Sequence, residues 1–279
     1  MKKLEEKIVK ALMIFASTTI LMVLLYILFI IISKGLPSLT WDMVLKNPSG
    51  GFYLGKEGGI LNAIIGSVML ITGSVLISMS ISLPVVLYIN FIRKKDSAFS
   101  DVVRFASDIL FGIPSIVYGA FGFMVMIYFG LQASLLGGIM AVSLLIIPIM
   151  TRSIDEVAGS VSQDLIEATK ALGATRYETL KVIVRQLSPG ITTAILLSVG
   201  RGIGDAATVL FTAGYTDGIP VSPLQPAATL PLAIFFQLSS PIEEVQNRAY
   251  AAALILTIII LLLSFSTRYF GRKMSKSKL

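Results

Sequence analysis

An arginine and an aspartate, Arg201 and Asp205, lie in the otherwise apolar stretch LLSVGRGIGDAATVLF, among glycines at positions 200, 202 and 204. A charge at the centre of a bilayer costs roughly 2.5–3.5 kcal/mol on insertion scales, so each residue needs compensation. At i and i+4 the two side chains share one helical face and can pair. Two interpretations stay open: a structural ion pair, or an arginine that lines a transport path. The guanidinium fork matches the oxygens of an anion such as phosphate.

The composition indicates the kind of protein that must position this pair. Hydrophobic residues make up 55% of the 279 positions and charged residues 14%, whereas a soluble domain carries about 25% charged residues. The chain is therefore an integral membrane protein. It contains neither cysteine nor histidine, which excludes disulfides, thiolate metal sites and the commonest general base. The net charge of +7 does not indicate a nucleic-acid partner, because the basic residues flank the apolar segments.

Apolar runs of about 20 residues are long enough to cross a bilayer as helices. We expect an all-α polytopic protein with six transmembrane helices, forming a single permease-like membrane domain over residues 1–279. The third run holds Pro114 and the small pair Ser115 and Gly119, so it predicts either close helix packing or a helix break that serves as a gate. The six runs are 11–32, 60–83, 105–129, 133–150, 190–213 and 247–267.

The distribution of Lys and Arg predicts the orientation. Eighteen of the 23 basic residues lie in four segments, and only four lie in the two other long loops, 33–59 and 214–248. Because Lys and Arg accumulate on the cytoplasmic side, we expect both termini to be cytoplasmic. The four basic segments are 1–10, 93–104, 151–189 and 268–279.

The segment 151–189 predicts a pair of short helices on the cytoplasmic side. The first, SQDLIEATKAL, ends at Gly173, which suits a left-handed position after a helix. The second begins at Thr175, whose capping box is completed by Glu178, and we expect Pro189 to end it at the membrane. Leu180, Ile183, Val184 and Leu187 would give it one apolar face. This elbow would lie against the membrane domain and present a rigid knob to the cytosol, or be an interfacial loop without a partner.

The sequence EATKALGATRYETLKVI resembles the EAA loop of the permeases of ABC importers, with Glu167, Ala168, Gly173, Ala174 and Ile183 in the matching segment. Thr169 replaces the second alanine of that motif, and Arg185 with Gln186 stand where the family has Leu-Pro. The resemblance implies a MetI-like architecture and a loop that docks on a separate ATP-binding subunit. In that case the chain is not an enzyme, and ATP and Mg²⁺ are bound by partner subunits. The nearest phosphate-loop pattern, from Gly50 to Lys56, continues with Glu57 instead of Ser or Thr.

The segments GIPSIVYG and GRGIGDAATVLFTAG are similar to those of the phosphate-importer branch of these permeases, the PstA type. The second motif usually has Glu where Asp205 stands. This resemblance implies import of inorganic phosphate across the plasma membrane, with Arg201 and Asp205 on the substrate pathway and Pro114 and Ser115 at a break or gate. It also implies four kinds of partner: the bilayer, a PstC-like second permease, two ATP-binding cassette subunits and an extracytoplasmic phosphate-binding protein. The alternatives are an ABC importer of sulfate or molybdate, and an ion-gradient-driven anion carrier.

Overall fold

The computed structural model describes residues 2–49, 57–93 and 97–276, and within these ranges the chain is almost entirely helical. The phosphate-loop-like segment 50–56 lies outside the described residues. A two-residue antiparallel pair, β1 (Pro48–Ser49) with β2 (Glu57–Gly58), joins the short outer helices to the bundle. The remaining elements are α1 (Lys2–Gly35), η1 (Leu36–Ser38), α2 (Trp41–Leu45), α3 (Leu61–Leu87), the π-helix η2 (Tyr88–Ile92), α4 (Ala98–Gly112), α5 (Ser115–Tyr128), α6 (Leu135–Ala158), α7 (Gln163–Ala171), α8 (Arg176–Ile203), α9 (Leu230–Leu238) and α10 (Glu243–Lys276).

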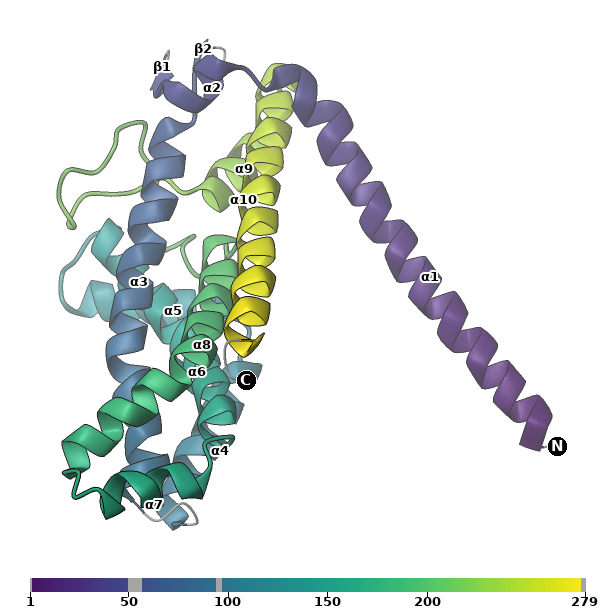
Figure 1. Ribbon diagram of the computed structural model, residues 1–279. Helices are drawn as coiled ribbons and strands as arrows, with labels where there is room; N and C mark the ends of the chain where they lie inside the picture. Colours follow the sequence, from purple (N-terminus) through teal and green to yellow (C-terminus); the bar gives the residue numbers. More distant parts are fainter. Residues whose placement is uncertain (1, 50–56, 94–96, 277–279) are drawn as a thin grey trace.

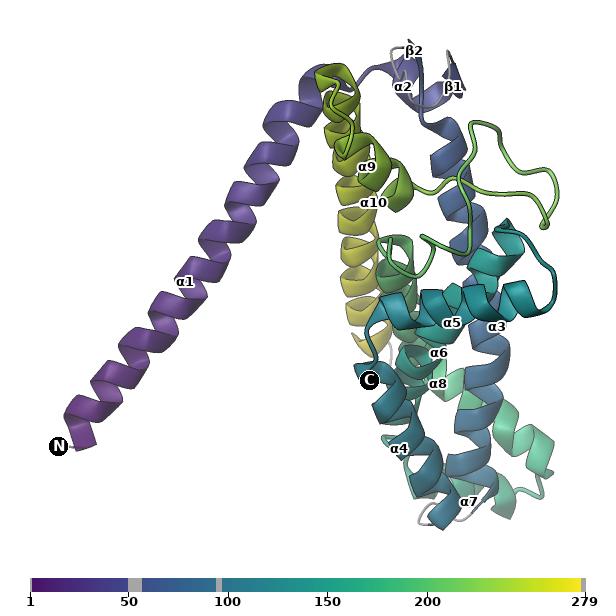
Figure 2. The same cartoon turned by 180° about the vertical axis from the view of Figure 1, so that it is seen from behind.

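The expected six membrane crossings are confirmed when one of them is counted as a broken pair. Among the described residues, α1, α3 with η2, α6, α8 and α10 are long and apolar enough to cross a bilayer singly. Helices α4 and α5 pass that test together, but they meet at an angle of 100°. Figure 2 shows α4 rising along the bundle and α5 lying across it.

A row of serines joins α3 to α6 in the centre of the bundle. Ser74, Ser78 and Ser82, one turn apart on α3, donate hydrogen bonds to carbonyl oxygens of α6, at 3.1 to 3.2 Å. Without side-chain bulk at these positions the two backbones approach closely, which is the usual way to associate helices in lipid. This contact holds α6, and with it the base of the elbow, against α3.

The break between α4 and α5 falls at Pro114, as the sequence predicted. Pro114 disfavours helical backbone at Ile113, which has ψ 131°, so α4 ends there. Tyr118, in the first turn of α5, is buried and donates its hydroxyl to the carbonyl of Leu110 at 2.7 Å. The hydrogen bond satisfies a carbonyl at the end of α4 and fixes the corner between the two helices.

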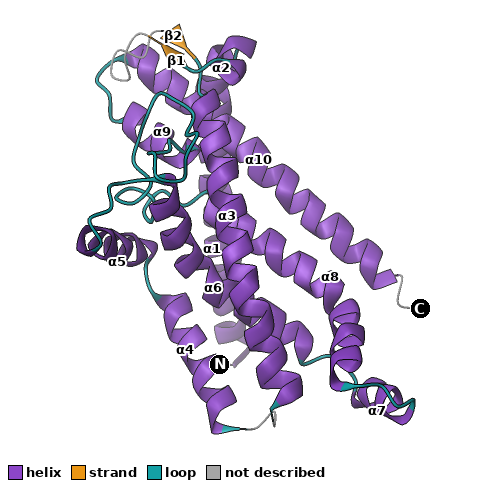
Figure 3. Cartoon of the chain, turned by 90° about the vertical axis from the view of Figure 1, so that its left-hand side faces the viewer, coloured by secondary structure: helices purple, strands orange, loops and turns teal. Residues whose placement is uncertain are grey.

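Helix α8 corrects two expectations about the fifth run. It continues through Pro189 instead of ending there, and it stops at Ile203, so residues 204–213 of the run are not helical. Pro189 cannot donate to the carbonyl of Arg185 four residues earlier, but the hydroxyl of Ser188 donates to that oxygen at 2.8 Å. The membrane helix and the second helix of the elbow are therefore one continuous helix, although Figure 3 shows it bent along its length. The segment between α6 and α8 is 159–175, which lies within the expected loop 151–189.

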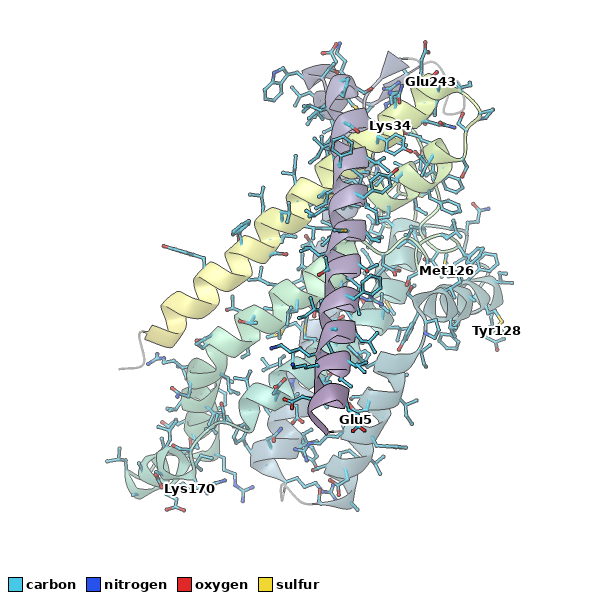
Figure 4. The ribbon with its side chains drawn as sticks, turned by 90° about the vertical axis from the view of Figure 1, so that its right-hand side faces the viewer. Glu5, Lys34, Met126, Tyr128, Lys170 and Glu243 are labelled. Carbon is cyan, nitrogen blue, oxygen red and sulfur yellow. The ribbon has the colours of Figure 1, made fainter. Side chains whose placement is uncertain are left out.

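Helix α1 leans away from the other helices along most of its length, as Figures 1 and 2 show. It meets α10 at its outer end, where a Cβ on Gly35 would lie 2.6 Å from the carbonyl oxygen of Tyr250. The ammonium of Lys34, labelled in Figure 4, lies 5.0 Å from the centre of the Tyr250 ring. In Figure 1 the beginning of α1 and the elbow point toward the same end of the molecule.

Candidate functional site

The two residues predicted for the pathway, Arg201 and Asp205, lie on either side of the point where α8 ends. Helix α8 ends at Ile203, with Gly204 as its C-cap, so Asp205 falls beyond the helix. For that reason the structure does not bring the side chains of Arg201 and Asp205 within ion-pair distance, so their mutual pairing, one of the two interpretations left open by the sequence, is not what it shows. The Asp205 carboxylate instead accepts a hydrogen bond from the backbone N–H of Thr208 at 2.8 Å. It caps the turn that follows α8.

Arg201 lies in the last turn of α8 with its side chain exposed. A cation there is favoured by the negative end of the helix dipole. Within the described part of the chain no carboxylate lies within 4.0 Å of its guanidinium. In Figures 1 and 3 this end of α8 is near the middle height of the bundle. An unpaired exposed guanidinium at such a depth can bind an anion or a group on another subunit, but it cannot face lipid at low cost.

The break at Pro114 and the non-helical segment after α8 touch each other. The hydroxyl of Thr208, three residues after Asp205, donates to the carbonyl of Ser115 at 3.2 Å. One turn further along α5, a Cβ on Gly119 would lie 2.8 Å from the carbonyl oxygens of Ala207 and Thr208. The structure therefore joins the corner at Pro114 to the unwound segment after α8, although the two are about 90 residues apart in the sequence.

A small cavity of about 10 Å³ with a mainly apolar lining lies behind Asp205, between the end of α8, α3 and the start of α9. Ser67 and Thr229 line it together with the aspartate. Thr229 is 3% exposed, and its hydroxyl has no hydrogen-bond partner among the described residues. A cavity of this size with several polar groups has room for one water molecule.

The elbow, defined here as residues 159–187, has the local structure that the sequence predicts. Gly173 has φ +79° and donates its N–H to the carbonyl of Lys170 at 2.9 Å, while Ala174 donates to Thr169 at 3.2 Å. These two bonds form a Schellman motif that ends α7. Thr175 and Glu178 form both bonds of the capping box that starts α8. The turn between the helices is thus specified from both sides.

The elbow buries one face and exposes another. Ile183 and Leu187 are buried against α3 and α6, and Leu180 and Val184 pack on the same cluster. Glu167 and Ala168 are exposed on α7, whereas Ala174 is half-buried. The sequence analysis missed two further residues at the tip, where Leu172 is 88% and Tyr177 is 77% exposed. Large apolar side chains so exposed on a capped turn are typical of a surface that a partner covers.

A charged cluster at the elbow end of the bundle also escaped the sequence analysis. Arg104 of α4 pairs with Asp155 of α6 at 3.0 Å, and Asn90 of η2 donates to the same carboxylate at 2.6 Å. Arg152 of α6 pairs with Asp108 of α4. These groups line a cavity of about 320 Å³ and tie α4 to the base of the elbow. The partners lie 44 to 65 residues apart, too far for any spacing rule.

Residues 80–276, which include the break points, α8 and the elbow, match the family described as binding-protein-dependent transport system inner membrane component. The chain belongs to this family. The match confirms a membrane permease component, a multi-pass inner-membrane protein that is not itself the catalytic subunit.

Curated relatives match almost the full length. The chain is 33% identical to the phosphate transport system permease protein PstA of Pasteurella multocida (strain Pm70), over 99% of this chain and 97% of the relative. It is 34% identical to the PstA of Haemophilus influenzae, over 88% of this chain and 86% of the relative. The PstA 2 of Mycobacterium bovis is 31% identical over 88% of this chain and 80% of the relative. The expected resemblance to PstA-type permeases is thereby confirmed.

A solved structure shares the fold. The chain resembles a protein of the inward-facing MetNI methionine ABC transporter, with a TM-score of 0.60 and 20% identity, over 77% of this chain and 95% of that one. At this identity the likeness concerns the fold alone, and it confirms the expected MetI-like architecture.

Proposed function

We propose that this chain is one of two permease subunits of an ATP-driven importer and that inorganic phosphate passes the end of α8, beside Arg201. The observation that carries the proposal is the exposed guanidinium at the end of α8, which has no carboxylate within ion-pair distance among the described residues. Relatives that match 88% to 99% of this chain are phosphate transport system permease proteins. The guanidinium binds phosphate oxygens in a bidentate way, which suits a transient anion site.

Asp205 takes part indirectly in this proposal. Its carboxylate holds the turn at Thr208, and Thr208 in turn binds the carbonyl of Ser115. A change at Pro114 and Ser115 would therefore reach the backbone beside Arg201 through two hydrogen bonds. We place Pro114 and Ser115 at a gate that opens and closes with this contact.

The test is phosphate uptake by cells or proteoliposomes that contain the assembled transporter. Arg201→Gln is expected to lower uptake at least tenfold, because one charge-assisted contact contributes about 1.5–3 kcal/mol. Arg201→Lys should retain part of the activity. Arg185→Gln, an exposed arginine on the same helix, is the matched control and should transport normally. Normal uptake by Arg201→Gln at wild-type membrane levels would refute the pathway role.

Anion selectivity needs its own measurement, since a guanidinium alone does not distinguish tetrahedral oxyanions. We expect excess unlabelled phosphate to abolish uptake of labelled phosphate, and excess sulfate or molybdate to leave it unchanged. Competition by sulfate at equal concentration would favour the sulfate and molybdate alternative. Uptake that survives ATP depletion while the ion gradient is held would favour the gradient-driven carrier.

The elbow is the proposed docking surface for the ATP-binding subunits, which would bind ATP and Mg²⁺. Glu167, Ala168, Leu172 and Tyr177 are exposed around the turn at Gly173, while Ile183 anchors the elbow in the bundle. The complete transporter would further contain a PstC-like permease, two ATP-binding subunits and an extracytoplasmic phosphate-binding protein. Leu172→Asp with Tyr177→Asp should abolish co-purification of the ATP-binding subunit, whereas Val182→Asp on the exposed side of α8 should not.

The orientation is proposed from the basic residues: both termini and the elbow would be cytoplasmic, in the plasma membrane. The chain contains no cysteine, so single cysteines report topology without background. A cysteine at exposed Leu172 should react with a membrane-impermeant maleimide only in inside-out vesicles. A cysteine at exposed Val221, in the loop before α9, should react only in right-side-out vesicles. The reverse pattern would overturn the orientation and the elbow's role together.

A further inference from the structure

A groove of about 230 Å³ separates the elbow from the end of α3. Phe91 and Ile92 of η2 form one wall, and residues of α7 and the first turns of α8 form the other. It is distinct from the exposed tip at Leu172 and Tyr177, because neither of those residues lines it. Figure 4 shows the elbow at the lower end of the molecule, with Lys170 labelled.

Among the described residues, the lining of the groove is basic. Lys170 and Arg176 are the two charged residues that the described part of the chain contributes to it, and it contributes no carboxylate. In the part of the chain that the structure describes, neither has a carboxylate within ion-pair distance. The charged cavity between α4 and α6 has a different balance, since its two arginines face three carboxylates, Asp108, Asp155 and Glu156. Among the described residues, the groove therefore has no carboxylate to balance its two cations, whereas the cavity between α4 and α6 has three.

Helix stability does not account for Arg176. It is the first residue of α8, where the helix dipole disfavours a positive charge. Lys170 lies in the last turn of α7, where the dipole of that helix favours a positive charge. The two side chains come from different helices and meet at one groove, on either side of the Schellman turn. A ligand with a negative charge would compensate both.

The remaining lining is largely apolar and lies at the end of a candidate membrane span, Leu61–Ile92. Ile166, Leu180 and Ile183 continue the hydrophobic cluster beneath the elbow, and Phe91 packs on it too. Ile92 is the last residue of a long apolar helix, and Arg93 directly follows it. A basic groove with an apolar floor at the edge of a span matches an amphiphile with an anionic head.

We infer that this groove binds the phosphate-bearing headgroup of an anionic membrane phospholipid, with the lipid's apolar part against Phe91 and Ile92. The lipid braces the elbow against α3 and neutralises Lys170 and Arg176. A free phosphate ion satisfies the two cations but leaves the apolar floor without a partner, so the lipid is the occupant that uses both parts of the lining.

The experiment measures lipid binding by native mass spectrometry of the full-length chain, titrated with phosphatidylglycerol or with zwitterionic phosphatidylcholine. Each basic residue near an anionic lipid contributes about fivefold in affinity, so Lys170→Gln with Arg176→Gln should weaken phosphatidylglycerol binding about 25-fold. The matched control is Lys181→Gln with Arg185→Gln. It removes the same charge from exposed positions of α8 outside the groove and should leave the binding unchanged.

Four outcomes would overturn the inference. The first two are equal losses in both double variants, which indicate non-specific attraction, and no loss in either. A third is displacement of the lipid by inorganic phosphate at equal concentration, which would identify a free-anion site. The fourth is complete exclusion of the lipid when the ATP-binding subunits are attached, which would assign the groove to the subunit interface. Retention of the lipid in the assembled transporter is the expected result.

Discussion

Replacing Gly173 by alanine isolates the backbone conformation of the elbow from its packing. Gly173 has φ +79°, a left-handed conformation, and an added Cβ would have no atom within 4 Å. The whole cost of Gly173→Ala is therefore conformational, about 1–2 kcal/mol. A penalty of this size changes the ratio of formed to unformed elbow about 5- to 30-fold. Gly173→Asn should cost less, because asparagine tolerates the left-handed region.

A matched control exists in the same loop. Gly159, the C-cap of α6, has φ −62°, and its added Cβ would lie 3.4 Å from the carbonyl oxygen of Glu156, an ordinary contact. Gly159→Ala should therefore be nearly neutral. Gly173→Pro should be the most damaging, because proline cannot adopt a positive φ and cannot donate to the carbonyl of Lys170.

The assay is the number of phosphate ions imported per ATP hydrolysed by the assembled transporter, together with amide hydrogen exchange in α7. We expect exchange to rise and coupling to fall in the order Gly159→Ala, Gly173→Asn, Gly173→Ala, Gly173→Pro, with membrane insertion unchanged. Equal behaviour of Gly159→Ala and Gly173→Ala would refute the reasoning, since the two differ in the sign of φ. Normal coupling in Gly173→Pro would refute the elbow's role.

The remaining predictions concern the helix bundle and the segment between α8 and α9. Arg104→Ala and Asp155→Ala, combined in a double-mutant cycle on thermal unfolding, should show a coupling energy of about 1 kcal/mol, because the pair is 31% and 19% exposed and partly screened. A coupling of zero would contradict the role of this pair in fastening α4 to α6. Gly119→Val should destabilise the chain by about 1–3 kcal/mol through its clash with the Ala207 carbonyl, and unchanged thermal stability would refute that contact. Burial raises the pKa of Tyr215, and nearby Asp217 raises it further, so its contribution to stability is complete below about pH 10 and is lost as the pH rises above that value. Absorbance titration of tyrosinate should show a late step that Tyr215→Phe removes.

The sequence predicted the elbow well because its signals are local. A glycine after α7, a threonine before α8 and a glutamate three residues later determine the turn through bonds between near neighbours. The apolar face of α8 at Ile183 and Leu187 likewise follows from helical periodicity. Nothing outside the segment had to be known.

The same local rules failed at two positions along α8. Proline at 189 was expected to end a helix, but Ser188 supplies the missing hydrogen bond to Arg185 and the helix continues. Asp205 was expected on the face of Arg201, but the helix had already ended at Ile203. Gly202 and Gly204 indicated that the helix would end here, since glycine disfavours helix interiors.

Two further contacts join residues that are distant in the sequence. The ion pair between Arg104 and Asp155 spans 51 residues, and the hydrogen bond from Thr208 to Ser115 spans 93. The serines of α3 gave a partial signal, because their spacing of four residues places them on one face. Their partners on α6 are backbone carbonyls, which have no sequence signature.

The continuity of α8 has a mechanical consequence. Had the helix ended at Pro189, a movement of the elbow could have been absorbed at a hinge between the elbow and the membrane helix. Instead one helix of 28 residues, about 42 Å long, runs from the capping box at Thr175 to the turn after Arg201. Its far end is bound to α5 through Thr208 and Ser115, and the base of the elbow is bound to α4 through Asp155 and Arg104. A displacement of the elbow would therefore be transmitted to both helices that meet at Pro114, α4 and α5. Under the proposed function, this corner is where binding of a partner at the elbow would change access to Arg201.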